Sequence, residues 1–381
     1  MRVPLTHRNT IVVPLLLGLS LSHLGCTASL PNSTVVGKEP PPSPSPSATA
    51  TVTPSDRAMP RYQHIFVMVE ENKGYGQIIG NPDLPVINQL AKTYGLATRF
   101  YGEVHPSEAN YIAMLGGSTF GIHDDDAYYC QAGSQEPFCG NAQQPGYANH
   151  TITARSLIDQ LEEKGLTWKG YFEDLPAPGS KVVVAPDLAH ALYAVKHNGF
   201  LNFKRVQADP NLAQKIVGLD QLAIDLKSGK VPNYSHIILN QCHEMHGLNQ
   251  CRELRPLLKT ADRKVGEVVQ LITQSKSWQS AENVAIVLTW DEDNSPPLKT
   301  EPQGCCGFEP RSAANFGGGH IPTLVITNHG PRGVADPTPY NHYSLLRTIE
   351  DAFGINEYLN FAKNTAQGVQ PMLPLWAVGQ K

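Results

Sequence analysis

The chain has 381 residues, a formal net charge of −4 and seven cysteines. This slightly acidic balance argues against the basic footprint of a nucleic-acid-binding domain, so we expect no nucleic acid among its partners. The length allows one large domain or two small ones. Because we find no second linker and no internal repeat, we expect one domain with insertions.

The first residues have the plan of a secretory signal. Basic residues precede a short apolar run, residues 11–21, which is too short to span a bilayer. Cys26 ends a sequence that resembles a bacterial lipobox, although His23 replaces the usual leucine. Residues 1–26 therefore predict export to the periplasm, the cell surface or the medium. Two outcomes stay open: a lipid on Cys26 that attaches the protein to a membrane, or a plain cleaved signal.

Residues 27–60 are rich in proline, serine and threonine and nearly lack bulky apolar side chains. Such a segment cannot bury a core, so we expect a disordered linker. It would serve as a tether behind a lipid anchor, or as a leader on a free protein. The folded domain is expected to span residues 61–381.

Within that domain, short apolar runs alternate with amphipathic patterns. The predicted strands are 64–69, 235–239, 284–289 and 321–327, and the predicted helices are 86–94, 153–164, 262–274 and 340–353. This alternation indicates an α/β domain with a mostly parallel central sheet sandwiched by helices. The aromatic and acidic segment 168–174 is interpreted as a buried connection, with a pocket lining as the alternative.

The six cysteines of the domain form three pairs that are close in sequence: Cys130 with Cys139, Cys242 with Cys251, and Cys305 with Cys306. In an oxidising compartment these favour disulfides, with the first two as loop staples. Other connectivities remain open. None of the pairs has the spacing of a structural zinc site.

Three of the predicted strands run directly into polar residues. The first leads to Glu71 and Asn72, the second to Glu244 and His246, and the third to Asp291-Glu292. In such sheets, ligands bind beyond the carboxyl ends of the strands. Taken singly, each acidic residue would be interpreted as a solvated loop residue or a helix cap. Their joint position predicts a shared site.

Ser107 follows an extended His105-Pro106 step and precedes a helical stretch, residues 109–115. A serine there is a natural helix cap, and on position alone that interpretation is favoured. The same position would hold a phosphate over the serine, because a helix N-terminus offers free N–H groups and a positive dipole end. No Gly-x-Ser-x-Gly elbow surrounds Ser107, so a metal is the better activator of its hydroxyl.

The strand-end residues supply candidate ligands for one or two divalent metal ions. A mixed set of carboxylates and histidines suits zinc, manganese or iron, whereas an all-oxygen shell suits calcium or magnesium. The candidates are Glu71, Asn72, Asp291, Glu292, Glu244, His246 and His320. His320 follows three glycines and is equally interpreted as a turn residue.

Several motifs occur in the order found in the bacterial phosphoesterase family: HIFVMVEENKGYGQIIG, HPSEANYIAMLGGSTFGI, NQCHEMHG, LTWDED, GGGHIPTLVIT and YNHYSLLRTIEDAFGI. From about His64 to Ile355 the chain resembles this family of acid phosphatases and phosphatidylcholine-type phospholipases C. The family is similar in turn to the alkaline phosphatase superfamily. The resemblance implies an alkaline phosphatase-like fold.

The resemblance also implies roles for the candidate residues. Ser107 would be the nucleophile, forming a phosphoseryl intermediate and touching the metal. Its metal shell would comprise Glu71, Asn72, Asp291 and Glu292, and a second metal site in two-metal relatives would correspond to Glu244, His246 and His320. Asn110 and the run Asp124-Asp125-Asp126 lie where relatives place phosphate-contacting groups.

The chain departs from its relatives at several positions. Two-zinc relatives usually have Asp-His in place of Asp291-Glu292, and family members often have Asp in place of Glu244. These departures leave metal number and identity open. Sulfatases have a different sequence after the nucleophile, so sulfatase activity is not expected.

We therefore expect an exported, metal-dependent hydrolase of phosphomonoesters, resembling acid phosphatases. Its leaving group would take a proton from His246, His320 or His105. Phospholipase C or another phosphodiesterase activity is the alternative, so the substrate is a small-molecule or lipid phosphate ester. A third possibility, of another class, is a non-catalytic surface binding protein on the same fold.

Overall fold

The computed structural model describes residues 58–294, 304–307 and 317–378. The expected signal segment, Cys26 and nearly all of the 27–60 linker lie outside these residues, so those predictions stay predictions. A search of the described helices finds none that is long and apolar enough to cross a membrane.

The strands are β1 (His64–Glu70), β2 (Gly95–Tyr101), β3 (Trp168–Phe172), β4 (Val184–Ala185), β5 (Tyr193–Ala194), β6 (Ile216–Gly218), β7 (Tyr234–Ile238), β8 (Val284–Trp290), β9 (His320–Thr327) and β10 (Val334–Asn341). The α-helices are α1 (Tyr75–Ile78), α2 (Pro85–Thr93), α3 (Glu108–Gly116), α4 (Leu157–Glu163), α5 (Lys204–Ala208), α6 (Pro210–Ala213), α7 (Asp220–Ser228), α8 (Leu254–Thr273), α9 (His342–Phe353) and α10 (Leu373–Trp376). The 3-10 helices are η1 (Val195–His197), η2 (Gly199–Asn202), η3 (Asn360–Lys363) and η4 (Thr365–Gln367).

Every predicted strand and helix has a counterpart among these elements. The last predicted helix begins later than expected, because Tyr340 and Asn341 still belong to β10. Residues 168–172, interpreted from the sequence as a connection, form the buried strand β3.

Eight strands form one sheet in the order β10-β2-β9-β8-β1-β7-β3-β6. β9 pairs antiparallel with β2 and β8, whereas the other neighbours pair in parallel. The predicted mostly parallel α/β sheet is therefore confirmed. The carboxyl ends of β1, β2, β7 and β8 meet at one edge, and β9 begins at that same edge.

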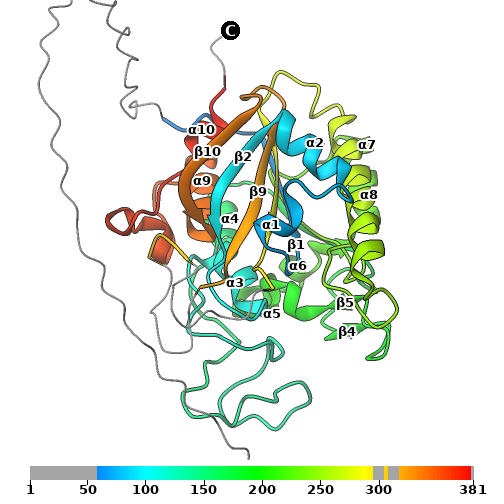
Figure 1. Ribbon diagram of the computed structural model, residues 1–381. Helices are drawn as coiled ribbons and strands as arrows, with labels where there is room; N and C mark the ends of the chain where they lie inside the picture. Colours follow the sequence, from blue (N-terminus) through cyan, green and yellow to red (C-terminus); the bar gives the residue numbers. More distant parts are fainter. Residues whose placement is uncertain (1–57, 295–303, 308–316, 379–381) are drawn as a thin grey trace, which may run out of the picture. The chain divides into compact units, whose positions relative to one another are not determined.

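Helices cover both faces of the sheet, as Figure 1 shows. Helices α2, α7 and α8 lie on one face, where Asp262 of α8 accepts the N–H groups of Val86 and Ile87 at the start of α2, at 3.0 and 2.8 Å. Helices α3, α4 and α9 lie on the other face. There Gln160 Nε2 of α4 donates to Glu350 Oε1 of α9 at 3.0 Å. This arrangement confirms the predicted sandwich.

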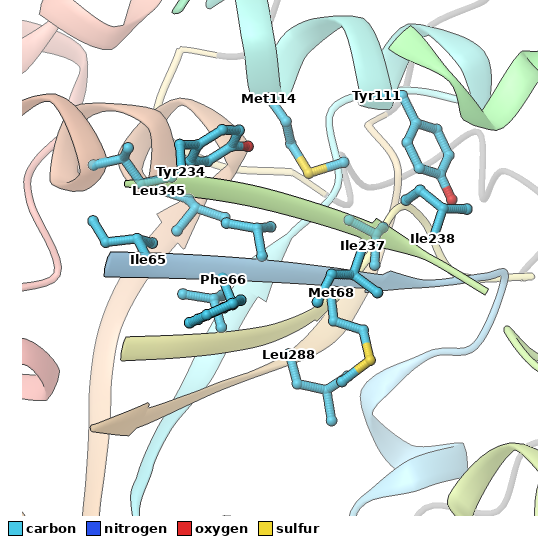
Figure 2. Packing of buried hydrophobic residues seen from close by; sticks show 14 of the residues in the cluster. Ile65, Phe66, Met68, Tyr111, Met114, Tyr234, Ile237, Ile238, Leu288 and Leu345 are labelled. Carbon is cyan, nitrogen blue, oxygen red and sulfur yellow. The ribbon is translucent and has the colours of Figure 1, made fainter. Parts of the chain in front are cut away.

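The centre of the sheet is apolar on both sides, because helices exclude water from both faces. Figure 2 shows Phe66 and Met68 of β1 on one side of the strands, and Tyr111 and Met114 of α3 on the other. Phe66 and Met68 are 0% exposed. Full burial of such a side chain contributes about 1.5–3 kcal/mol to folding. This packing fixes the strand ends, and with them the residues that follow.

The structure contains the three disulfides suggested by the cysteine spacing: Cys130–Cys139, Cys242–Cys251 and Cys305–Cys306. Cys242–Cys251 closes the loop after β7, which carries Glu244 and His246. This disulfide therefore restrains part of the candidate site.

Candidate active site

Ser107 lies at the start of helix α3, at the carboxyl edge of the sheet, and is 1% exposed. Its side chain makes no capping hydrogen bond to the helix. Instead the hydroxyl donates to Glu71 Oε2 at 3.1 Å and lies 3.3 Å from Glu292 Oε1. Asp125 Oδ1 accepts the N–H of Glu108 at 3.2 Å. The Ser107 hydroxyl is thus not used as a helix cap and faces two carboxylates.

Neighbouring strands bring these carboxylates together. β1 and β8 are parallel neighbours, with Glu70 opposite Trp290, so the next residues, Glu71 and Asp291, lie side by side. The N–H of Asn72 donates to Asp291 Oδ1 at 3.0 Å. Asn72 adopts a left-handed backbone conformation with φ of 51°, which asparagine tolerates better than most residues. The two strand ends therefore form one buried acidic cluster, the floor of the candidate site.

Burial makes the ionised forms of these carboxylates unfavourable when no cation is bound. Burial and the neighbouring Asp291 raise the pKa of both Glu71 and Glu292 well above its usual range. Burial also raises the pKa of Asp291 to about 6. Three ionised carboxylates so close together repel one another strongly in a dry environment. A cation would relieve that repulsion.

The donor atoms are of the types that bind divalent metal ions. Asn72 Oδ1 and Asp291 Oδ2 are buried and have no hydrogen-bond partner among the described residues. A buried unpaired oxygen is costly, and a bound cation would satisfy both atoms. Together with Glu71, Glu292 and the Ser107 hydroxyl, these oxygens form a hard donor set of the kind that magnesium, calcium and manganese prefer.

A second group of candidate ligands shares Glu71. One ligand atom each from Glu71, His197 and His246 lie within 4.8 Å of one another. His197 bridges two carboxylates, with Nε2 3.2 Å from Glu71 Oε1 and Nδ1 2.8 Å from Glu244 Oε1. Burial lowers the pKa of His197 well below its usual value, which favours the neutral imidazole that binds metals. The structure thus brings Glu244 and His246 to the first group through a histidine that the sequence analysis missed.

His320 lies at the same edge of the sheet, but its side chain contacts other residues. Its Nε2 lies 2.9 Å from the carbonyl oxygen of Thr98, and its ring stacks on Tyr75 with centroids 4.5 Å apart. Within the described residues, the histidines of the candidate metal group are His197 and His246, and His320 is not among them. The role of His320 as a metal ligand stays a prediction, and His197 joins the candidate ligands.

Two of the predicted substrate-contacting residues, His105 and Asn110, occupy different environments. His105 Nδ1 lies 2.5 Å from Glu292 Oε2, and its side chain is partly exposed. Asn110 is fully buried, and its amide oxygen accepts the N–H groups of Glu103 and Val104 at 2.9 and 3.2 Å. Asn110 therefore holds the turn that leads to Ser107, and its amide nitrogen donates to the carbonyl oxygen of Val104 at 2.7 Å. The predicted phosphate contact from Asn110 does not fit this geometry.

Lys196 was missed by the sequence analysis altogether. Its Nζ lies 3.0 Å from Asp125 Oδ2 and 3.3 Å from His246 Nε2. Burial lowers the pKa of Lys196, but the carboxylates of Asp125 and Glu71 outweigh burial and hold that pKa above its usual value. An ammonium group is therefore fixed beside the candidate site. No strand-end pattern marks it, because Lys196 and His197 belong to the short helix η1.

The chain matches the model of the phosphoesterase family over residues 80–356. It is 27% identical to a phosphatidylinositol-3-phosphatase of Mycobacterium tuberculosis, over 84% of this chain and 84% of that protein. It is 24% identical to a phosphate-repressible acid phosphatase of Penicillium chrysogenum, over 71% of this chain and 54% of that protein. The chain thus spans about half the length of the fungal relative.

A non-specific phospholipase C1 of Arabidopsis thaliana is 24% identical, over 72% of this chain and 47% of that protein. A solved protein of the alkaline phosphatase superfamily from Vibrio parahaemolyticus is 13% identical, with a TM-score of 0.45 over 79% of this chain and 70% of that chain. The family match covers well over half of the sequence. The chain therefore belongs to the phosphoesterase family, and it is a hydrolase of phosphate ester bonds.

Proposed function

We propose that the protein is an exported, metal-dependent phosphomonoesterase that works through a phosphoseryl intermediate on Ser107. The observation that carries the proposal is the position of the Ser107 hydroxyl. It is released from capping by Asp125 and directed at Glu71 and Glu292, at 3.1 and 3.3 Å. A serine that served only as a cap would bond to its own helix.

Each part of the candidate site has its own role in the proposed phosphoryl transfer. A divalent cation held by Glu71, Asn72, Asp291 and Glu292 would lower the pKa of the serine hydroxyl and offset phosphoryl charge. The Ser107 hydroxyl passes its proton to Glu71 Oε2, to which it donates a hydrogen bond, and its oxygen forms the new bond to phosphorus as the bond to the leaving alcohol breaks. The positive end of the α3 helix dipole lies at Ser107 and would favour the developing negative charge. Water then attacks the phosphoseryl group and releases phosphate.

The leaving alcohol needs a proton. In this proposal His105 donates it, because its side chain is partly exposed beside Glu292. His246 is a weaker candidate, since its Nδ1 lies 2.9 Å from the carbonyl oxygen of Gly247 and its Nε2 lies 3.3 Å from Lys196 Nζ. His320 is also a weaker candidate, since its Nε2 is engaged with the carbonyl of Thr98.

The relatives favour monoesters. Those named above include a phosphatidylinositol-3-phosphatase and an acid phosphatase, which support a monoester substrate on a small molecule or a lipid. The phospholipase C relative keeps diester hydrolysis as the alternative. A non-catalytic surface protein is disfavoured, because the serine and its carboxylates are all present.

Export is supported by the signal-like residues 1–26 and by the disulfides of the domain. Disulfides persist in oxidising compartments and are rare in the cytosol. A lipid on Cys26 would hold the enzyme at a membrane, and residues 27–60 would then act as its tether.

The test is hydrolysis of p-nitrophenyl phosphate and bis-p-nitrophenyl phosphate by the purified protein, across pH and with a panel of divalent metals. We expect metal-dependent turnover of the monoester that Ser107→Ala abolishes. Ser118→Ala is the matched control, because Ser118 lies just beyond the same helix and its hydroxyl accepts the N–H of Phe120 at 2.9 Å. Near-normal turnover by Ser107→Ala would overturn the proposal, and a preference for the diester would replace it with the alternative.

A further inference from the structure

The candidate site has a buried floor and a partly exposed mouth. Ser107 and Glu71 form the floor and are 1% and 0% exposed. The side chains of Lys196 and Asp125 are 22% and 28% exposed and stand at the mouth. Lys196 and Asp125 are therefore more accessible to solvent than Ser107 and Glu71.

Hydrogen bonds relate Lys196 to the nucleophile. Lys196 Nζ donates to Asp125 Oδ2 at 3.0 Å, and Asp125 Oδ1 accepts the N–H of Glu108 at 3.2 Å. Glu108 is the residue directly after Ser107. The ammonium group of Lys196 is thus separated by a single carboxylate from the backbone N–H of the residue that follows Ser107.

Lys196 retains capacity to bind a ligand. An ammonium group has three N–H donors, and in the described part of the chain Lys196 has two polar partners, Asp125 and His246. The other lysine close to these carboxylates, Lys73, is 5% exposed, and its Nζ donates to the carbonyl oxygen of Met245 at 2.7 Å. Lys196 is therefore the better placed of the two to meet a substrate.

The charge of the substrate determines how strongly a contact with the Lys196 ammonium group stabilises its binding. A phosphomonoester carries up to two negative charges on three terminal oxygens, whereas a diester carries one charge on two. The candidate site already contains several carboxylates, so an incoming dianion meets more repulsion than a monoanion does. A fixed cation at the mouth offsets that repulsion where it is greatest.

We propose that Lys196 is a substrate-binding residue that contacts a terminal oxygen of the phosphoryl group and selects dianionic monoesters over diesters. This inference rests on the proposed function, because it assumes that phosphoryl transfer takes place at Ser107. Asp125 orients the ammonium group and is a positioning residue.

The test compares Lys196→Gln and Lys196→Arg with the matched control Lys169→Gln. Lys169 of strand β3 also forms an ion pair with a buried carboxylate, that of Asp225 in helix α7. Neither residue belongs to the candidate site. We expect Lys196→Gln to lower kcat/KM for p-nitrophenyl phosphate by about 100-fold and for bis-p-nitrophenyl phosphate by less than about 5-fold. Lys196→Arg, which keeps the charge, should restore most of the monoester preference, and Lys169→Gln should leave it unchanged.

A second readout does not depend on turnover. Inorganic phosphate should bind Lys196→Gln at least about 10-fold more weakly by titration calorimetry, with the metal content of the protein unchanged. Equal losses on both esters, or unchanged phosphate affinity, would overturn the inference. If Ser107→Ala kept full activity, the proposed function would fail, whereas the phosphate titration would still decide the role of Lys196.

Discussion

Asp125 Oδ1 accepts the backbone N–H of Glu108 at 3.2 Å, so an aspartate from a separate loop caps the helix that begins beside Ser107. The other oxygen of Asp125 accepts a hydrogen bond from Lys196 Nζ at 3.0 Å. One carboxylate thus takes over the capping of α3 from Ser107 and orients the cation at the mouth of the site.

Replacing this carboxylate should therefore affect stability and activity together. Asp125→Ala removes a helix cap, and we expect the free energy of unfolding to fall by about 1 kcal/mol. We also expect kcat/KM for a monoester to fall by at least about 10-fold, because Lys196 loses its partner. Urea unfolding and steady-state kinetics measure the two effects.

The matched control for Asp125 is Asp209, which caps α6 by accepting the N–H of Asn211 at 2.9 Å. Asp209→Ala should destabilise the protein by a similar amount and leave kcat/KM unchanged. If the two variants lose stability alike and both keep full activity, the link between Asp125 and the site is wrong.

Metal removal should lower both activity and stability. Without a cation, the buried carboxylates of Glu71, Asp291 and Glu292 repel one another, so dialysis against a chelator should lower the thermal midpoint. A metal at about 100 times its Kd stabilises the folded state by about 2.7 kcal/mol, and readding it should restore the midpoint. In Asp291→Asn the metal should raise the midpoint less. A thermal midpoint that changes neither on chelation nor on readdition of metal would contradict the assigned donor set.

A buried carboxyl away from the site should make stability depend on pH. Burial raises the pKa of Glu350 to about 8 from an ordinary value of 4.5, although hydrogen bonds from Leu359 N–H and Gln160 oppose that rise. Between these values the folded state binds a proton that the unfolded state has released. The contribution of Glu350 to stability is therefore complete below about pH 4.5 and is lost as pH rises through about 8.

Glu350→Gln keeps a neutral side chain at every pH and so should remove this dependence. Relative to the unmodified protein, we expect the variant to gain about 4 kcal/mol of unfolding free energy between about pH 5 and about pH 9. Denaturant unfolding at the two pH values measures the change. A stability difference that stays constant with pH would show that Glu350 is ionised throughout.

The sequence predicted the parts of the site that lie directly after strands. The apolar runs of β1 and β8 are unmistakable, because a sheet covered on both faces needs apolar residues at nearly every position. Parallel pairing of those strands then placed Glu71 beside Asp291 and Glu292. The same reasoning found β7 and the loop that carries Glu244 and His246.

The remaining site residues had no such signal. Lys196 and His197 belong to a 3-10 turn in an irregular region, where neither the helical nor the strand period applies. Their positions depend on long-range contacts, such as the one between His197 and Glu244. His320 had the opposite kind of signal, because it begins strand β9 at the predicted edge of the sheet. Its Nε2 lies 2.9 Å from the carbonyl oxygen of Thr98 on β2, and its role as a metal ligand stays a prediction.

The central claim is that Ser107 carries the phosphoryl group during turnover. Acid quenching during steady-state hydrolysis of p-nitrophenyl phosphate, followed by peptide mass spectrometry, tests it most directly. We predict one phosphoryl group on the peptide that contains Ser107, located on that serine and absent from Ser107→Ala. Sustained turnover with no phosphoserine at this position, under conditions where release of phosphate limits the rate, would contradict the account.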